Sequence, residues 1–266
     1  MNLKDCSLLI QGSFHQNSII GINYLGDIFG EIIYSTYPVT DELYDFLKNN
    51  NIEERTKLII NDNNKPRHVL PDNVGLIQQN FYKQVISTYN GLKECTKKYV
   101  LKMRSDEYYL GLDKITDFVK EDKINFINIF FRHFNRFPYH PSDHMFLAEK
   151  NVLVDAFDIL YHACYVNFEE FMLRTCQDPN VQLFAEQAIA LAFLHKLTGG
   201  AKIPFHDINY NVMLFKKFFH IFTAKSIGPY CICNSRINHN GKQFVTNIED
   251  SPLWLKNDCN SMRQYQ

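Results

Sequence analysis

The chain has 266 residues, 45% of them hydrophobic and 21% charged, which is enough apolar material for one large domain or two small ones. A formal net charge of -1 excludes a global field that would attract nucleic acid, so any anion has to bind at a local cluster. The seven cysteines are irregularly spaced, which argues against a disulfide framework and for a reducing compartment. The start MNLKDC lacks the pattern of a signal peptide, and no run approaches the roughly 18 apolar residues of a membrane span. We therefore expect a cytoplasmic protein.

Short apolar strands alternate with helical patterns at the beginning of the chain. Each strand stops at a cluster of small polar residues, and a helix or connection follows. This alternation predicts an α/β fold with a mainly parallel sheet. The predicted strands are Leu8–Ile10, Glu31–Tyr34 and Lys57–Ile60, and the predicted helices are Ser18–Phe29 and Glu42–Lys48, the second capped by Thr40 or Asp41.

A long helix is predicted from Asp72 or Asn73 to about Cys95, followed by the run KYVLKMRSDEYY. The run begins as a strand, and alternation puts Lys102 and Arg104 on one face. It then breaks at Asp106, just beyond the carboxyl end of the strand, where α/β sheets bind ligands. A carboxylate beside two cations suits a metal-bound phosphate. The alternative is a surface turn with Arg104 and Asp106 as a solvated pair.

The second half of the chain is mostly helical. We expect a buried strand at Ile124–Phe131, helices over Asn151–Cys176 and Val181–Leu197, and a basic, aromatic helix over Asn211–Lys225. Asp178 is the predicted cap of the second of these helices, and Ile203–Phe205 is a predicted last strand. We expect a core domain at residues 1–205 and a C-terminal extension at residues 206–266 packed on it.

Three acids suggest a common chemistry. In this hypothesis Asp106 holds Mn²⁺ or Mg²⁺, which bridges the diphosphate of a sugar nucleotide and neutralises its charge. Asp143, in HPSDH, is the general base. Glu186, inside an apolar helix, binds sugar or acceptor hydroxyls or orients His140 or His144. Two alternatives are open: Asp143 is a helix cap, or His140, Asp143 and His144 form a metal triad, which the proline at 141 disfavours.

Seven segments occur in an order that resembles a known family. They are LLIQGS, EIIYST, LIIND, KQVISTYNGL, KYVLKMRSDEYY, HPSDHMF and AEQ, from about Leu8 to Gln187. Their succession is similar to the WavE family of lipopolysaccharide-synthesis glycosyltransferases and to glycosyltransferase domains of large viruses. The resemblance implies a GT-A-like fold, a nucleotide-binding mixed and mainly parallel sheet flanked by helices.

The resemblance also implies roles for individual residues. Asp106 would be the metal ligand and Asp143 the base of an inverting transfer, while His140, His144 and Glu186 would lie on the acceptor side. One departure concerns the usual Asp-x-Asp motif, whose first acid is replaced by Arg104, so that Arg104 itself can contact phosphate. The residues implied in nucleotide-sugar binding are Gln11, Gly12, Ser13, Ser35, Thr36, Asp62, Lys83, Lys102, Arg104 and Ser105.

Together these features predict a metal-dependent, inverting glycosyltransferase that uses a UDP-, GDP- or dTDP-sugar and a glycan or lipid-linked acceptor in surface glycan synthesis. Nucleic acid is not an expected partner. The Asn211–Lys225 helix either meets an anionic membrane or is a core helix with a basic rim. Two other functions are open: a sugar-1-phosphate nucleotidyltransferase, although only Gly12 lies near the first strand where that class has a Gly-rich loop, and a silent sugar-nucleotide-binding domain.

Overall fold

The computed structural model describes residues 1–14, 16–38, 41–49, 55–62, 77–129, 138–181, 183–227 and 230–232. Its centre is a seven-stranded sheet with the strand order β3-β2-β1-β4-β7-β6-β8. A second, two-stranded sheet pairs β5 with β9. The strands are β1 (Cys6–Gln11), β2 (Glu31–Thr36), β3 (Lys57–Ile60), β4 (Tyr99–Arg104), β5 (Glu107–Tyr109), β6 (Ile124–Ile127), β7 (Met145–Glu149), β8 (Phe219–Phe222) and β9 (Tyr230–Ile232).

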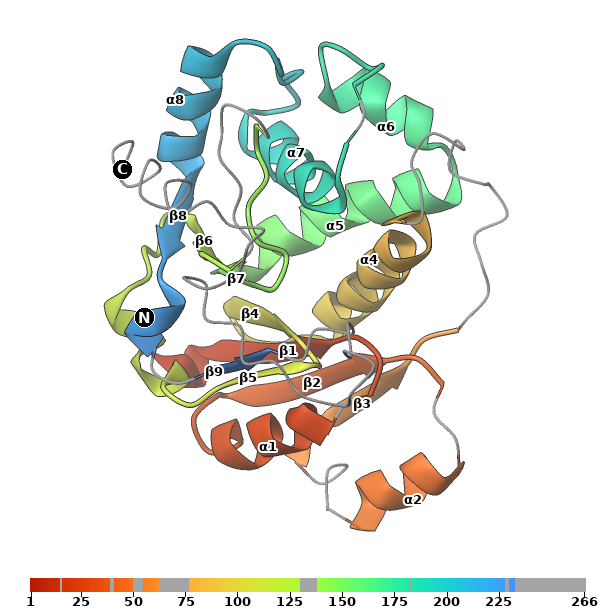
Figure 1. Cartoon of the computed structure of the whole chain (residues 1–266), viewed down its shortest axis with the longest axis vertical. Helices are drawn as coiled ribbons and strands as arrows, with labels where there is room; N and C mark the ends of the chain where they lie inside the picture. Colours follow the sequence, from red (N-terminus) through yellow and green to blue (C-terminus); the bar gives the residue numbers. More distant parts are fainter. Residues whose placement is uncertain are drawn as a thin grey trace, which may run out of the picture.

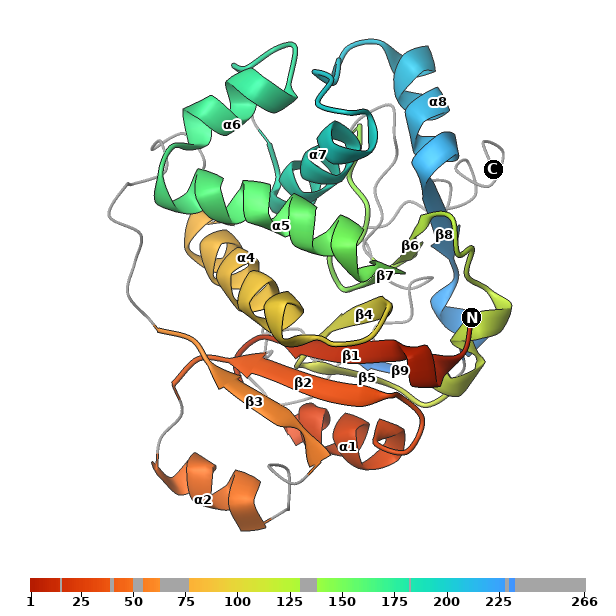
Figure 2. The same cartoon turned by 180° about the vertical axis from the view of Figure 1, so that it is seen from behind.

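Helices cover both faces of the large sheet. Figures 1 and 2 show α4, α5 and α7 on one face and α1 on the other. The predicted α/β architecture, a mixed and mainly parallel sheet flanked by helices, is confirmed. The helices are α1 (Gln16–Leu25), α2 (Asp41–Asn49), α4 (Ile77–Glu94), α5 (Lys150–Tyr165), α6 (Phe168–Thr175), α7 (Ala185–Leu197) and α8 (Ile208–Phe218), with short 3₁₀ turns at η1 (Leu3–Asp5), η3 (Leu112–Asp117) and η4 (Ala224–Ile227).

One strand of the large sheet runs against its neighbours. β1, β2, β3 and β4 are parallel, whereas β7 is antiparallel to both β4 and β6. In the β4–β7 register Lys102 lies opposite Phe146 and Met103 opposite Met145. The residues just before β7, including Asp143, are therefore brought to the carboxyl end of β4.

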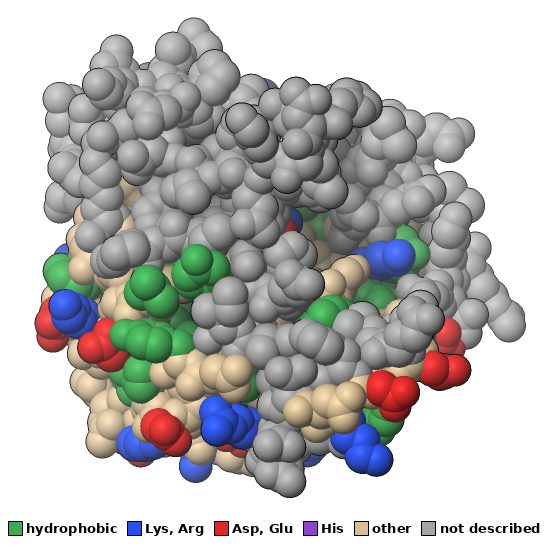
Figure 3. All heavy atoms as spheres, turned by 60° about the horizontal axis from the view of Figure 1, so that its bottom comes forward, with side chains coloured by type: hydrophobic (Ala, Val, Ile, Leu, Met, Phe, Trp, Pro, Cys, Tyr) green, Lys and Arg blue, Asp and Glu red, His purple; other side chains and the backbone are tan. Residues whose placement is uncertain are grey.

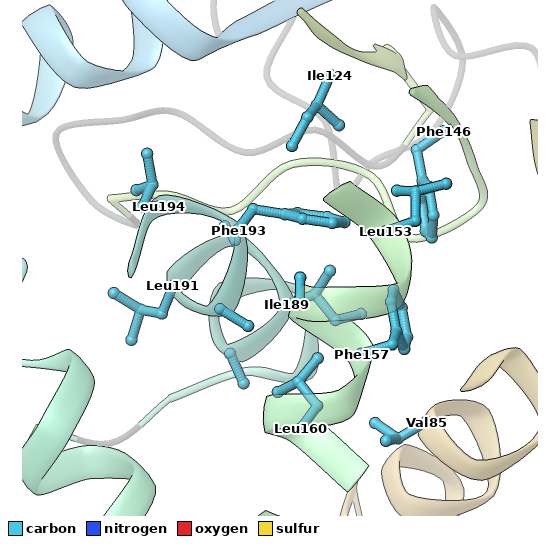
Figure 4. Close-up of a cluster of buried hydrophobic side chains, with 14 of the residues drawn as sticks. Val85, Ile124, Phe146, Leu153, Phe157, Leu160, Ile189, Leu191, Phe193 and Leu194 are labelled. Atoms are coloured by element: carbon cyan, nitrogen blue, oxygen red, sulfur yellow. The ribbon is translucent and has the colours of Figure 1, made fainter. Parts of the chain in front are cut away.

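Each face of the sheet has its own core, because successive residues of a strand point to opposite faces. Leu9 and Val100 belong to the core under α4, α5 and α7, whereas Leu8 and Leu101 belong to the core on the α1 side. The first core is rich in aromatic residues. Figure 4 shows Phe193 of α7 beside Phe146 and Phe157, with ring centroids 5.9 and 6.1 Å from that of Phe193.

The first strands lie where the sequence predicts them, but several later boundaries differ. The predicted Asn151–Cys176 helix is two helices, because the Asn167 side chain caps α6 by accepting hydrogen bonds from two backbone amides. The predicted cap at Asp178 is wrong: α7 begins at Ala185, and Gln187 Oε1 accepts the Phe184 amide at its start. Ile203 forms only an isolated bridge with Cys176, not a strand.

The predicted Asn211–Lys225 helix ends at Phe218, where α8 gives way to β8. Phe219 and Phe222 are buried, and pairing with β6 satisfies backbone groups that a longer helix would have satisfied internally. The predicted C-terminal extension thus contributes an edge strand to the core sheet, and the division at residue 205 stays a prediction. The predicted cap at Thr40 and the helix start at Asp72 or Asn73 lie outside the described residues. None of the helices within the described ranges is long and apolar enough to cross a membrane.

Candidate functional site

The carboxyl ends of β1 and β4 are locked together at Gly12. Ser105 donates its amide to the Gln11 carbonyl at 2.9 Å and its hydroxyl to the Ser13 carbonyl at 2.6 Å. Gly12 has a φ of +132°, and a Cβ placed there would lie 2.5 Å from Ser105 Oγ. The strand ends therefore approach this closely because residue 12 is glycine.

Arg104, the last residue of β4, lies at the centre of an acidic cluster. Its Nε and Nη2 each donate to one Asp106 oxygen at 3.0 Å. Its Nε lies 3.5 Å from Glu107 Oε1, and its Nη1 lies 3.9 Å from Asp143 Oδ2. Asp106 and Asp143 thus both lie beside one guanidinium. The Asp106 side chain is only 17% exposed, so the pair is not the solvated surface pair of the alternative.

Asp143 is buried and held as a carboxylate. Gln84 Nε2 of α4 donates to its Oδ2 at 2.8 Å. Burial alone raises the pKa of Asp143, but His144, Arg104 and Lys102, with the Gln84 hydrogen bond, together lower that pKa well below its usual range. The helix-cap alternative for Asp143 is wrong, because the strand β7 begins two residues later.

Lys102 supports Asp143 from inside the sheet. It is completely buried, its Nζ donates to the Asp143 carbonyl, and it lies 5.3 Å from the centre of the Phe146 ring. Burial lowers the pKa of Lys102 to about 8, although the nearby Asp143 opposes that shift. Lys102 and Arg104 share a face, as predicted, but Lys102 is sealed in the core.

Two residues of the cluster, Glu107 and Gln84, were not predicted as site residues. Glu107 is completely buried; it accepts hydrogen bonds from His144 Nδ1 and, at 2.6 Å, from the Tyr109 hydroxyl. Strand alternation through EYY could have revealed it, since Glu107 and Tyr109 share the buried side of β5. Gln84 lies on α4, from which its side chain reaches Asp143.

Other residues predicted to bind the nucleotide form hydrogen bonds between elements of the fold. Gln11 donates to Ser87 Oγ at 2.9 Å, while Ser35 and Thr36 are completely buried and both accept from the Asn61 side-chain amide, Thr36 through its carbonyl. These bonds tie the ends of the first strands to one another and to α4.

Three further residues predicted to bind the nucleotide are exposed or partly buried. Ser13 and Asp62 are exposed, and Lys83 is half-buried, with its Nζ 5.3 Å from the centre of the Tyr37 ring. Contact between these residues and a nucleotide stays a prediction.

His140 and Glu186, two of the residues predicted to bind the acceptor, lie together. His140 Nε2 is 3.4 Å from Glu186 Oε2, and the His140 ring lies against Phe184. Glu186 thus orients His140 rather than His144, which Glu107 holds. The described residues contain no group of three or more His, Cys, Asp or Glu side chains that could hold a metal ion, which counts against the histidine triad.

The expected metal site does not fit the residues that surround it. Mg²⁺ and Mn²⁺ bind carboxylate oxygens, but Arg104 engages both oxygens of Asp106. Burial raises the pKa of Asp106, but the hydrogen bonds and charge of Arg104 lower it. The net result is a pKa of Asp106 below its usual value. Asp106 is therefore the ion-pair partner of Arg104. Figure 3 shows charges of both signs interspersed among the described side chains of one face.

Comparison with known proteins gives a family match. The profile described as WavE lipopolysaccharide synthesis matches residues 58–225, more than half of the chain. No curated protein matches.

Among solved structures, HddC from Yersinia pseudotuberculosis is 11% identical, with 85% of this chain and 92% of that chain covered and a TM-score of 0.39. A glycosyltransferase involved in glycosylation of the major capsid of PBCV-1 is 9% identical, with 82% and 81% covered and a TM-score of 0.37. TarS residues 1–349 from S. aureus are 17% identical, with 73% and 56% covered and a TM-score of 0.38. These similarities are too remote to inform the chemistry of the chain.

Proposed function

Because the chain belongs to the WavE lipopolysaccharide synthesis family, we propose that it is a glycosyltransferase that moves a sugar from a nucleotide diphosphate to a hydroxyl of a glycan. The observation that carries this proposal is the cluster at the ends of β1 and β4, in which Arg104 lies between Asp106 and Asp143. A fixed cation and an ionised carboxylate in one cluster are what a leaving diphosphate and an attacking hydroxyl require.

The proposed reaction is a direct displacement with inversion. Asp143 accepts the proton of the acceptor hydroxyl while that oxygen attacks the anomeric carbon, and the bond between this carbon and the diphosphate oxygen breaks with its electron pair leaving on the diphosphate. Gln84 and Lys102 fix the Asp143 carboxylate and backbone. Donor charge beside Arg104 would raise the depressed pKa of Asp143 and make it a stronger base.

The His140–Glu186 pair is our candidate for the acceptor side, since His140 belongs to the same HPSDH segment as Asp143. The two groups supply a hydrogen-bond donor and an acceptor of the kind that sugar hydroxyls use. No step of this mechanism depends on a metal ion.

The test is nucleotide release from UDP-, GDP- and dTDP-sugars in the presence of a glycan acceptor. We expect Asp143→Asn to abolish transfer and retain nucleotide binding. The matched control is Asp155→Asn, which removes a carboxylate from an exposed ion pair with Lys196 and should leave transfer unchanged. Equal loss of binding and transfer in Asp143→Asn would remove Asp143 as the base, and an absence of nucleotide binding and release across the whole panel would refute the function.

Two other results would redirect the assignment. Pyrophosphate as a product would indicate a sugar-1-phosphate nucleotidyltransferase. Sugar-nucleotide binding without turnover would indicate a silent binding domain.

We also propose that the enzyme works in the cytoplasm and that α8 contacts an anionic membrane, where a lipid-linked acceptor would be found. Met213, Lys216 and Lys217 are exposed on this helix, which gives it an apolar contact beside two positive charges. Sedimentation with vesicles that contain phosphatidylglycerol should decrease in a Lys216→Glu, Lys217→Glu variant. Equal sedimentation of the variant and the unsubstituted protein would contradict the contact.

A further inference from the structure

We propose that Arg104 takes the place of the divalent metal ion expected at this turn, so that the donor diphosphate binds to the guanidinium and needs no metal. The inference rests on the proposed function, since it concerns how the same site holds its donor. It follows from the contacts of Arg104 and Asp106.

The Asp106 carboxylate already has a cationic partner. Asp106 is the acid that a metal would use, but the Arg104 fork engages both of its oxygens at 3.0 Å. A metal ion on these oxygens would sit directly beside a guanidinium that stays charged at all working pH values. Like charges at such short range repel, so the pair as built disfavours the ion.

The Nη1 group of Arg104 is less closely engaged than Nε and Nη2. Its Nη1 lies 3.9 Å from Asp143 Oδ2, too far for a hydrogen bond, and donates no other hydrogen bond within the described residues. The Arg104 side chain is 31% exposed, whereas the neighbouring Lys102 is completely buried. Arg104 is therefore a cation of this cluster that a ligand can reach, with N–H groups left to donate to phosphate oxygens.

Arg104 is also held rigidly by its neighbours. Arg104 ends a buried central strand, and Asp106, Glu107 and Asp143 surround its guanidinium. Glu107 is itself fixed by Tyr109 and His144. A cation held in one orientation by buried partners resembles a bound metal ion in being preorganised, and such fixed charges stabilise a leaving group without reorganisation.

The test measures binding of UDP, GDP and dTDP by calorimetry, once with EDTA and once with Mn²⁺. We expect the dissociation constant of the preferred nucleotide to agree within about threefold between the two conditions. Arg104→Asp places an acid at both ends of the 104–106 triplet. This variant should lose affinity by roughly tenfold or more in EDTA and regain it with Mn²⁺.

Two further variants separate charge, geometry and folding. Arg104→Lys keeps the charge without the fork, so it should bind roughly tenfold more weakly in EDTA with no rescue by Mn²⁺. Arg174→Asp, in an exposed ion pair with Glu170 on α6, should bind as the unsubstituted protein does. If Arg104→Asp does not fold, comparing nucleotide binding in EDTA with binding in Mn²⁺ for the unsubstituted protein and for Arg104→Lys still tests the inference.

Binding by the unsubstituted protein that requires Mn²⁺ would overturn the inference and leave the proposed function intact. An absence of binding in both conditions, for all nucleotides, would overturn the function and the inference together. Binding that is equal in EDTA and in Mn²⁺ would support both.

Discussion

Removing the Arg104 side chain should destabilise the fold, because the cluster would keep its carboxylates and lose the cation among them. We consider Arg104→Met, which preserves an unbranched stem and removes the charge. Two hydrogen bonds of 3.0 Å join the guanidinium to Asp106, and its Nη1 lies 3.9 Å from Asp143 Oδ2. A single pair at such a distance is worth about 4 kcal/mol at an effective dielectric constant of about 20.

The net loss of unfolding free energy is smaller than the sum of these pair energies, because the variant avoids the cost of removing the Arg104 charge from water. Breaking a buried ion pair costs about 3–5 kcal/mol. Arg104 is 31% exposed, so we expect the low end of that range, about 3 kcal/mol. For a chain of this size that corresponds to a melting temperature lower by roughly 6–12 °C.

The loss should depend on pH in a defined direction. The pKa values of Asp106 and Asp143 are lowered in the folded protein. Groups of this kind contribute stability above their unfolded pKa and lose it as the pH falls through the folded pKa. The deficit of Arg104→Met should therefore be complete at about pH 7 and smaller at about pH 2, which lies below the unfolded pKa of an aspartate, about 3.9.

The assay is denaturant unfolding followed by circular dichroism at these two pH values. Arg174→Met is the control, because its ion pair with Glu170 is exposed and should be worth less than about 1 kcal/mol. A deficit below about 1 kcal/mol for Arg104→Met, or one that is equal at both pH values, would refute the reasoning.

Three other predictions concern packing and close approach. Phe193→Ala should lower the unfolding free energy by about 3–5 kcal/mol through the cavity left among aromatic rings, and denaturant melts with a loss below about 1 kcal/mol would contradict this. Gly91→Ala should destabilise by about 1–3 kcal/mol despite a better helix propensity, because the new Cβ would lie 2.3 Å from Leu9 Cδ1; a more stable variant in the same melts would show that Leu9 can move aside. Gly12→Ala should weaken nucleotide binding more than Gly199→Ala, since both glycines have a positive φ but only Gly12 would clash with Ser105, and equal calorimetric affinities would count against the β1–β4 junction as part of the site.

The sequence predicts the frame of the site well because that frame is local. The Lys57–Ile60 strand is found with its predicted bounds, and Asp106 follows the strand β4 that ends at Arg104. Alternation within a strand and polar residues at its end are short-range signals. The hypothesis that Asp106 and Asp143 act together rests on three acids in the sequence. The position of both beside Arg104 depends on the pairing of β4 with β7, which periodicity does not reveal.

What the sequence could not predict depends on contacts between distant segments. Glu107 is bound by His144, 37 residues away, and Asp143 is held by Gln84, 59 residues away. The family resemblance assigns Ser35 and Thr36 to the nucleotide pocket, and the sequence does not reveal the tertiary hydrogen bonds that bury both residues. The end of α8 at Phe218 was missed for a similar reason, since only the pairing with β6 favours the strand.

The reversed direction of β7 has a consequence for how the two halves of the site can vary. The sheet register, with Met103 opposite Met145, fixes the separation between the end of β4 and the start of β7. The intervening chain holds β5, β6 and the buried Glu107, so only the connections between these elements can lengthen or shorten without moving Asp143 away from Arg104. A shift of β7 by a single residue, in contrast, would turn His144 to the opposite face of the sheet and dismantle the cluster. The connections can thus vary in length while the paired strands keep Arg104 and Asp143 at a constant separation.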